Sequence, residues 1–513
     1  MKRALIIAAI ILLIAAVVGL VFLGALMLNN YAETGSVFGS SPIISSSFWD
    51  KLFGKDEPEV PEDWQELVNE ENFKFEELAD GTISIKLIDN GGSDILVIPE
   101  EYNGKPVTTI NYNRVHPSYA DPDNKIKKLI IPDSVTTIKE GAFGEFLALE
   151  EVVIGNGVTT IGEKAFMGCD SLQSIVIPDS VLEIGKSAFF GCDSLKSVKL
   201  SRSLTSIPLL AFGDTPISYI ELHEGITSIE HGAFKDCVHL TKVFIPSSVE
   251  FIDSTAFMGT DSLESIEVDS KNPYYYSHGN CLIQTDTRSL IKGCKNSEIP
   301  QEVTEIGDYA FTNSSITQVI IPNGVTRIGN AAFGECNALL SIEIPSSVKT
   351  IERNAFNRCE SLKKVILNDG LEEIKEGAFY CCHALESIIV PASVSTIYRL
   401  AFASCTSLKY ISLLGPIKIG DSAFYNCTAL ENIDLSYATV IQDGAFYYCE
   451  NLTTVKLSTN TTEIWDQVFS YTKLQTVNFE GTMEEWEKVF KDSKWIENET
   501  PVTVICTDGE IEY

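Results

Sequence analysis

The sequence predicts an α/β-type repeat solenoid, in which each coil combines a short strand with an irregular turn on the convex side. The first observation is the dipeptide Ala-Phe, which recurs every 22 or 23 residues with a single longer interval. The second is the order of apolar residues in each copy, whose spacing fits neither one helix nor one long strand. The third is length, because 513 residues exceed what one hydrophobic core can accommodate. The repeat phenylalanines are Phe143, Phe166, Phe189, Phe212, Phe234, Phe257, Phe311, Phe333, Phe356, Phe379, Phe402, Phe424 and Phe446, and Val468-Phe469 keeps the same phase.

The N-terminal segment predicts a membrane anchor. Lys2 and Arg3 precede residues 4–28, a run of 25 residues without a charge. As a helix this run would be about 37 Å long, which is enough to cross a hydrocarbon core of about 30 Å. No basic residue follows until Lys51, so the positive-inside rule places the N-terminus in the cytoplasm and the rest of the chain outside the cell. We therefore expect residues 1–30 to form a cytoplasmic stub and a single-pass transmembrane helix; cleavage as a signal peptide, followed by secretion, is the alternative.

Two further segments precede the repeats. Residues 31–70 are rich in Gly, Ser, Pro and acidic residues, which predicts a flexible acidic tether. Residues 71–106 contain two strand-like runs on either side of Asn90-Gly91-Gly92, which predicts an N-terminal β cap. A cap is needed because the first coil has no neighbour to cover its apolar face.

The repeats form two predicted blocks, residues 107–268 and residues 298–479. In the copy at residues 171–192, alternating apolar residues predict a short strand, and Pro178 ends its hydrogen bonding. The chain then returns across the convex side to the repeat phenylalanine. The inward positions of this copy are Leu172, Ile175, Ile177, Val181, Ile184 and Phe189.

The longer interval lies between Phe257 and Phe311 and measures 54 residues. Within it, two strand-like runs are joined by Thr285-Asp286-Thr287-Arg288, so residues 269–297 are predicted to form an inserted β-hairpin. Residues 480–513 leave the repeat pattern and are predicted to form a C-terminal cap.

These motifs resemble a known family. The phrases Ile-Pro-Asp-Ser-Val-x-x-Ile, Ile-Gly-x-x-Ala-Phe-x-x-Cys and Ser-Leu-x-x-Ile are similar to those of the BspA-like leucine-rich repeat family of bacterial cell-surface proteins. Asn272-Pro273-Tyr274 in the insertion and Glu480-Gly481-Thr482 in the tail fit the same family. The resemblance runs from about Phe73 to the end of the chain. It implies leucine-rich repeats, surface exposure, binding of proteins or host matrix in some members, and no catalytic activity; it carries no fixed ligand residues.

Composition excludes several functions. The chain has 38 Lys and Arg against 71 Asp and Glu, and its net charge of −33 would repel nucleic acid. No His-Glu-x-x-His zinc motif and no Gly-x-Ser-x-Gly nucleophile motif occurs in the sequence. His231 occupies a variable loop position and is interpreted as a solvated imidazole. We expect no cofactor, no metal and no catalytic residue.

Cysteine follows the repeat. Nine of the 13 cysteines stand three positions after a repeat phenylalanine, and a catalytic thiol would not recur in this way. Stacked coils are about 4.8 Å apart, whereas disulfides prefer a Cβ separation of about 3.8 Å, so a ladder of free, buried thiols is predicted. In an exported protein, free thiols indicate an oxygen-poor habitat. Cys281 and Cys294 flank the hairpin, and pairing between them stays open. The predicted ladder consists of Cys169, Cys192, Cys237, Cys336, Cys359, Cys382, Cys405, Cys427 and Cys449.

The candidate binding residues are outward-facing strand side chains, which line the concave wall of such a solenoid. Apolar and aromatic residues in these positions favour an interface, although β-propensity also enriches Ile and Val there. The inserted hairpin is the alternative binding element. The predicted ligand-binding residues are Phe244, Tyr219, Lys242, Ile366, Ile389 and Tyr410.

These observations predict a membrane-tethered cell-surface protein that mediates protein–protein binding or adhesion without catalysis. Its expected partner is a protein of the host matrix or of a neighbouring cell. One alternative is a passive spacer or structural protein of the cell envelope, whose strand wall should be no more apolar than its loops. The other is an enzyme whose site is built across several coils, which would need a non-repeating cluster of His, Cys and acid.

Overall fold

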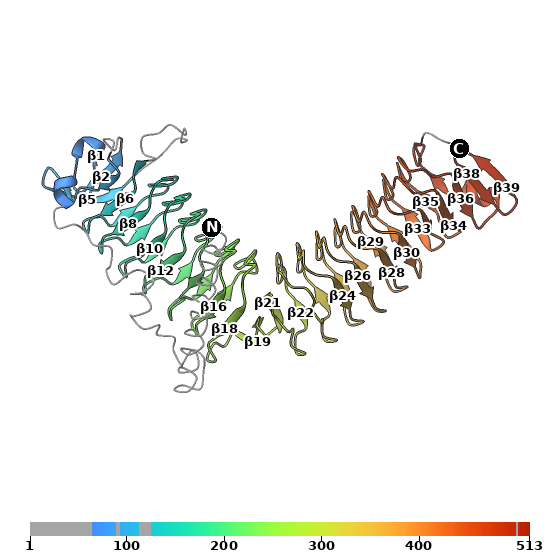
Figure 1. Ribbon diagram of the computed structural model, residues 1–513, viewed down its shortest axis with the longest axis horizontal. Coiled ribbons are helices and arrows are strands. Elements are labelled where there is room, and N and C mark those ends of the chain that lie inside the picture. Colours follow the sequence, from blue (N-terminus) through green and yellow to red (C-terminus); the bar gives the residue numbers. More distant parts are fainter. Residues whose placement is uncertain (1–63, 89–92, 112–124, 499–500) are drawn as a thin grey trace, which may run out of the picture. The chain divides into compact units, whose positions relative to one another are not determined.

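The computed structural model describes residues 64–88, 93–111, 125–498 and 501–513 (Figure 1). The predicted anchor and all but the last residues of the predicted tether lie outside the described residues. Within the described part of the chain, none of the helices has the length and apolar character needed to cross a membrane.

The described chain winds as a β-solenoid in which each regular coil contributes two strands to two parallel sheets (Figure 1). The first strand of a coil pairs residue for residue with that of the next coil, as where Val243 lies opposite Ile266. The second strand is usually only two residues long and pairs in the same way, as where Ile351 lies opposite Ile374. Side chains that alternate inward from both sheets form the core between them.

The first strands are β3 (Ile95–Val97), β6 (Lys128–Ile131), β8 (Glu151–Ile154), β10 (Ser174–Val176), β12 (Ser197–Lys199), β14 (Tyr219–Ile220), β16 (Lys242–Ile245), β18 (Ser265–Val268), β24 (Ser341–Ile344), β26 (Lys364–Leu367), β28 (Ser387–Val390), β30 (Tyr410–Leu413), β32 (Asn432–Asp434), β34 (Thr454–Leu457), β36 (Thr476–Phe479) and β38 (Thr503–Cys506). The second strands are β5 (Lys105–Ile110), β7 (Thr137–Ile138), β9 (Thr160–Ile161), β11 (Glu183–Ile184), β13 (Ser206–Ile207), β15 (Ser228–Ile229), β17 (Phe251–Ile252), β22 (Glu305–Ile306), β23 (Arg327–Ile328), β25 (Thr350–Ile351), β27 (Glu373–Ile374), β29 (Thr396–Ile397), β31 (Ile417–Ile419), β33 (Ala438–Ile441), β35 (Glu463–Ile464) and β37 (Phe490–Lys491).

The predicted repeat solenoid is confirmed, but in the described residues it is a β-solenoid rather than one of α/β type, because the return path of the coil carries a second strand and no helix. The physical reason lies in the turn around the repeat phenylalanine. In the coil of Phe356, the residues two before and two after it, Asn354 and Arg358, have φ angles of 55° and 56°. Left-handed residues cannot continue a right-handed helix, so this segment turns tightly instead.

The repeat phenylalanines form two stacks inside the turn, one from Phe143 to Phe257 and one from Phe311 to Phe469. Their ring centroids are 5.1 Å apart between Phe333 and Phe356 and again between Phe356 and Phe379, with almost parallel planes. The backbone supports the stack, because the amide of Phe356 donates to the carbonyl of Ala378 in the next coil at 2.8 Å. Each regular coil is therefore held by its neighbours through two sheets and this turn ladder.

The regular pattern breaks at three strands, β19 (Tyr275–His278), β20 (Cys281–Gln284) and β21 (Ser289–Gly293), which pair antiparallel in sequence order. The first-strand sheet is interrupted between β18 and β24, while β21 pairs with β22 and opens the next second-strand sheet. The buried residues form two clusters. The N-terminal core extends from Phe73 to Cys294, and the C-terminal core from Cys281 to Cys506.

Strand β20 belongs to both cores. Leu282 packs in the N-terminal core, whereas its neighbours Cys281 and Ile283 pack in the C-terminal core. This follows from the alternation of side chains along a strand, which points successive residues to opposite faces.

Both ends of the solenoid are covered. At the N-terminal end, two short 3-10 helices, η1 (Trp64–Leu67) and η2 (Glu70–Asn72), precede the antiparallel pair β1 (Phe73–Glu77) and β2 (Ile83–Leu87), and β4 (Glu101–Tyr102) pairs with β5. At the other end, α3 (Met483–Lys488) begins at a capping box formed by Thr482 and Glu485. Its Trp486 is buried and donates from Nε1 to the Tyr513 hydroxyl at 2.8 Å, next to the final strand β39 (Gly509–Glu512).

Candidate binding surfaces

The nine repeat cysteines are fully buried, and their thiols make the same contact in every coil. Each Sγ donates to the carbonyl oxygen of the repeat phenylalanine in the preceding coil, at 3.0–3.4 Å. Where threonine takes this position, as in Thr215, Thr260 and Thr472, its hydroxyl donates to the phenylalanine carbonyl of its own coil. The cysteine thiol therefore adds a hydrogen bond to a buried carbonyl, which in most of these coils also accepts from the backbone amide three residues later, as Phe356 does from Cys359 at 3.3 Å.

The cysteines are poor candidates for chemistry. Burial raises the pKa of Cys237 to about 11 and that of Cys336 to about 12, so both thiols stay protonated and weakly nucleophilic at neutral pH. All 13 cysteines are free thiols. Cys281 and Cys294 do not pair; they are buried in different cores.

The six predicted binding residues fall into two groups. Tyr219, Lys242 and Phe244 belong to β14 and β16 before the hairpin, and all three are half-buried. Tyr219 lies opposite Lys242 in the parallel register. Burial, followed by the negative charge of Glu221, raises the pKa of Tyr219, so its hydroxyl is neutral. Half-burial reduces the area that these three side chains can offer to a partner.

The second group is exposed on the four-stranded sheet β24-β26-β28-β30. Tyr410 is 69% exposed, Ile389 58% and Ile366 36%. Leu414, directly after β30, is 51% exposed, and Ile320, in the coil before β24, reaches 82%. We call these five residues the aliphatic face. Because neighbouring strands lie about 4.8 Å apart, the outward side chains of the four strands form one surface.

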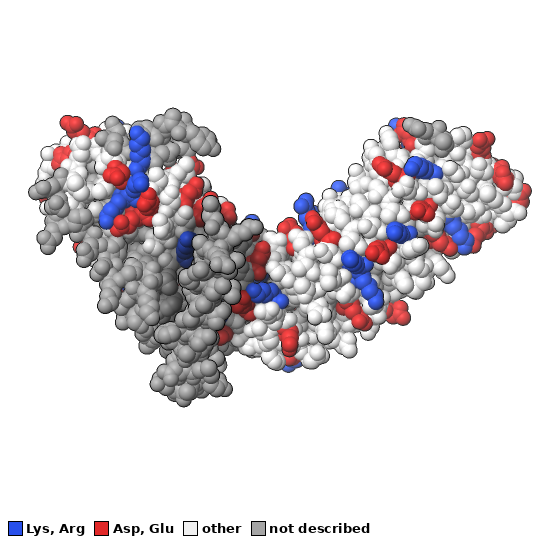
Figure 2. Space-filling view, in the orientation of Figure 1, with Lys and Arg blue, Asp and Glu red and all other residues white. Residues whose placement is uncertain are grey.

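Charged side chains of both signs are interspersed over the coils after the hairpin, with wide uncharged areas between them (Figure 2). Several pairs connect adjacent coils, such as Lys456, whose Nζ is 3.2 Å from Asp434 and 2.7 Å from Glu480. Both partners of these pairs are solvent-exposed, so each pair adds little stability. Charge on this surface is suited to orienting a partner more than to holding it.

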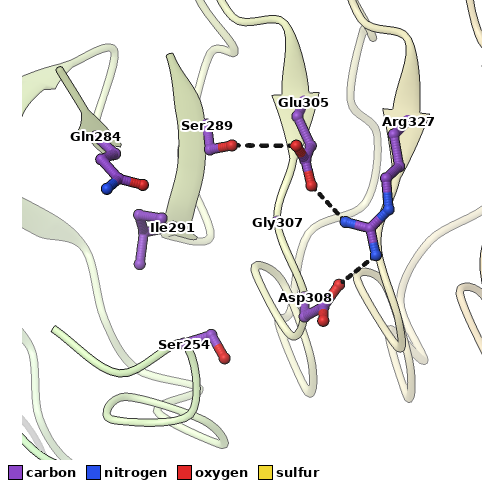
Figure 3. Close-up of a pocket in the computed structure, with 8 residues that line it drawn as sticks. All are labelled: Ser254, Gln284, Ser289, Ile291, Glu305, Gly307, Asp308 and Arg327. Carbon is purple, nitrogen blue, oxygen red and sulfur yellow. Dashed lines mark hydrogen bonds and ion pairs between the residues drawn. The ribbon is translucent and has the colours of Figure 1, made fainter. Parts of the chain in front are cut away.

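A shallow polar pocket of about 200 Å³ lies beside the hairpin, where Gln284, Ser289 and Ile291 meet the coils that follow (Figure 3). Arg327 occupies one side of it. Its guanidinium contacts Glu305 and lies 3.0 Å from Asp308 and 3.4 Å from Glu352. Burial lowers the pKa of Arg327, but the hydrogen bonds and charges of Glu305 and Asp308 outweigh burial and raise it.

The contacts in this pocket tie coils together. Arg327 is already surrounded by three carboxylates, and the Ser289 hydroxyl donates to Glu305 at 3.3 Å, so neither side chain is set up as an anion site or a nucleophile. Among the described residues, no group of three or more His, Cys, Asp or Glu is arranged to hold a metal ion.

Sequence reasoning missed one polar pair at the junction of the two cores. Lys292 on β21 is 3% exposed, and burial lowers its pKa. Burial raises the pKa of Asp261 to about 6, against the opposing effect of the Lys292 charge. The two residues are 31 positions apart and belong to different coils, so spacing alone could not connect them; the one available signal was a lysine inside an apolar strand.

His231 lies on a turn and contacts two other side chains. The geometry of these contacts does not suit catalysis. Its Nδ1 lies 2.9 Å from the Thr255 hydroxyl and 3.4 Å from Asp253. Thr255 also donates to Asp253. In a nucleophilic triad the base accepts from the hydroxyl and the acid holds the other ring nitrogen, whereas here both partners face the same nitrogen.

Together these features define a class of protein: a β-solenoid whose repeated side chains stabilise stacked coils, and whose variable side chains lie on its surfaces. The family model described as "BspA type Leucine rich repeat region" matches the chain in six copies, over residues 117–220, 159–282, 290–409 and 372–497. This is more than half of the chain. The protein belongs to the BspA-type leucine-rich repeat family, which confirms the resemblance seen in the sequence.

The chain is similar to several solved structures, the first of which supports the fold. A leucine-rich repeat protein from Eubacterium ventriosum is 20% identical, with a TM-score of 0.52, over 79% of this chain and 94% of its own. A leucine-rich cell surface protein from Faecalibacterium prausnitzii is 24% identical, with a TM-score of 0.47, over 86% of this chain and 99% of its own. A leucine-rich repeat protein from Bacteroides ovatus is also 24% identical, with a TM-score of 0.48, over 83% and 98% of the two chains. No curated protein matches the sequence.

Proposed function

We propose that this protein stands on the cell surface and binds a protein ligand, from the host matrix or a neighbouring cell, through the aliphatic face. The observation that carries the proposal is the exposure of Ile366, Ile389 and Tyr410 on three neighbouring coils after the hairpin. Contiguous exposed apolar side chains of this size mark interaction sites on soluble surfaces. Aromatic residues such as Tyr410 commonly supply a large part of the binding energy.

The structure around the face supports this role. Ile389 lies opposite Ser412, and Ser387 lies opposite Tyr410, in a fully paired parallel register. The inward neighbours Ile388 and Ile411 are buried in the core, so the outward side chains stand on a rigid sheet. A preorganised surface loses little entropy on binding, which favours affinity.

The cellular location is part of the same proposal. Residues 1–30 would anchor the protein as a single-pass helix with its N-terminus in the cytoplasm, and the solenoid would extend outside the cell. The similar protein from Faecalibacterium prausnitzii is described as a cell surface protein, which supports this location. Secretion after signal cleavage is the alternative.

The test uses the double variant Ile389→Ser and Tyr410→Ser in the purified full-length chain. Pull-downs against host-matrix and neighbouring-cell proteins identify the ligand, and its affinity is then compared between variant and wild type. We expect at least a tenfold loss, or about 1.4 kcal/mol. Neither side chain points into the core, so the melting temperature should change little.

The matched control is the pair Phe244→Ser and Tyr219→Ser, on half-buried positions before the hairpin. We expect it to weaken binding less than the first pair. The contrary result is a ligand that binds the Ile389→Ser and Tyr410→Ser variant as tightly as wild type and fails to bind a variant with Asp286→Ala and Arg288→Ala in the exposed hairpin loop. This result would identify the hairpin as the binding element instead. A protein that captures no ligand at all would favour the passive spacer.

A further inference from the structure

A second surface, separate from the aliphatic face, lies on the turn side of the last coils. Tyr425 directly follows the repeat residue Phe424, Tyr447 and Tyr448 follow Phe446, and Tyr471 stands two positions after Phe469. We call these four tyrosines the tyrosine ridge. Tyr471 is 48% exposed and the other three are half-buried.

The four rings contact one another across three consecutive coils. Tyr425 stacks on Tyr447 with centroids 6.0 Å apart, and Tyr448 stacks on Tyr471 at 4.9 Å. Tyr447 meets Tyr448 edge to face at 4.6 Å and an angle of 89°. Because the rings touch, no ligand can enter between them, and what they offer is their outer faces and their hydroxyl edges.

Two of these rings stand at the turn position that has a positive φ throughout the repeats. Tyr448 and Tyr471 have φ angles of 61° and 56°. Other coils place glycine, as at Gly168, or a residue with a side chain, such as Arg358 or Cys381, at the same position with the same sign of φ. The positive φ is thus a feature of the repeat, and the last two coils differ in placing a tyrosine at this position.

Neutral hydrogen-bonding side chains lie beside the ridge. Asn426 donates from Nδ2 to the Ser404 hydroxyl at 3.4 Å, and Asn498 donates to the Thr472 hydroxyl at 3.0 Å. Desolvation, and then the neighbouring phenols of Tyr448 and Tyr471, raise the pKa of Tyr447, so this ring is uncharged at neutral pH. The ridge therefore combines aromatic faces with hydroxyl and amide groups and contains no aliphatic side chain.

We propose that the tyrosine ridge binds a neutral polysaccharide. The apolar C–H face of a sugar ring carries positive partial charge and stacks on the negative face of a phenol ring, while sugar hydroxyls bond to the phenol, amide and hydroxyl groups nearby. A polymer suits the ridge better than a single sugar, because tyrosines from three consecutive coils can contact successive units. This site goes beyond the proposed protein-binding function, because it lies on the turns rather than on the first-strand sheet and takes a different class of ligand.

The experiment is native gel electrophoresis of the purified full-length chain in gels that contain soluble β-glucan, galactomannan or arabinoxylan. We expect at least one of these polysaccharides to retard the wild type. The double variant Tyr447→Ala and Tyr471→Ala should weaken that retardation at least tenfold. The variant Tyr447→Phe with Tyr471→Phe keeps the rings and should retain part of the binding.

Two controls separate this site from the fold and from the aliphatic face. The single variant Tyr471→Ala removes only the most exposed ring and should stay folded. It replaces the double variant as the test protein if the double variant has a lower melting temperature. Tyr410→Ser should leave the retardation unchanged. The proposal is overturned if none of the three polysaccharides retards the wild type, or if the alanine variants are retarded as strongly as wild type. Loss of a protein ligand in these variants, with no polysaccharide bound, would make the ridge part of a protein interface.

Discussion

At the scale of single residues, the repeat phenylalanine and the cysteine of the next coil act as a pair. The ring of Phe356 has no exposed surface and packs between two identical rings. The thiol of Cys382, in the next coil, donates to the carbonyl of Phe356 at 3.2 Å. The ring of Phe356 thus fills the core, while its backbone carbonyl accepts a hydrogen bond from the neighbouring coil. One position therefore contributes both to packing and to hydrogen bonding.

Phe356→Ala should lower the free energy of unfolding by about 3–5 kcal/mol, because removing a large buried ring leaves a cavity that the stacked neighbours cannot fill. Nearest-neighbour coupling should spread the loss to adjacent coils rather than to the whole solenoid. Urea denaturation and limited proteolysis would measure both effects. Unchanged stability and unchanged protease resistance would contradict the role assigned to the stack.

At the scale of elements, the hairpin strands β20 and β21 do more than interrupt the repeat. Leu282 and Cys294 complete the N-terminal core, while Ile283 and Leu290 complete the C-terminal core. The first turn ring after the insertion, Phe311, faces Gly293 at the end of β21. Deleting the hairpin would therefore open both cores, and for this reason its binding role is better tested with substitutions in its exposed loop.

Gly293→Ala should destabilise the junction by about 1–3 kcal/mol, as overpacking does in a filled core. An added Cβ at this position would lie 2.0 Å from a ring carbon of Phe311, so the ring or the strand would have to move. Thermal unfolding measures the change. Gly334→Ala is the control, because its nearest contact would be an ordinary 3.4 Å, and equal melting temperatures for the two variants would contradict the packing argument.

At the scale of the whole molecule, the described residues hold two candidate surfaces with different chemistry. The aliphatic face lies on the first-strand sheet after the hairpin, whereas the tyrosine ridge lies on the turns of the last coils. Both are built from variable positions on coils whose repeated positions are committed to the core. A solenoid allows this combination because each coil needs only its inward side chains for stability.

At this scale the prediction concerns the orientation of the chain in the membrane. Protease added to intact cells should remove the solenoid and leave a small N-terminal fragment in the membrane, because residues 4–28 are apolar enough and long enough to span it. Immunoblotting with antibodies against each part would follow the two products. Recovery of the solenoid from the medium, with a new N-terminus near Tyr31, would show that the segment is cleaved instead.

The sequence by itself determined the repeat period, the coil-forming fold and the family, because these depend on short-range order within one coil. The Ala-Phe dipeptide marked the residue that enters the core at the turn. The alternation of side chains along the strand explains why Ile388 is buried and Ile389 exposed. The same order placed nine cysteines at one structural position. It did not predict the second strand of the coil, since two residues are too few to carry a periodic signal.

Only the tertiary structure decided which outward residues are available. Phe244 and Ile389 occupy equivalent outward positions in their strands, yet the first is half-buried and the second is 58% exposed. The contact of Tyr425 with Tyr447, and the proximity of Asp261 to Lys292, likewise appeared only when separate coils were stacked. The physical reason is that a repeat specifies the direction of a side chain within its own coil, whereas exposure and clustering depend on what the neighbouring coils place beside it.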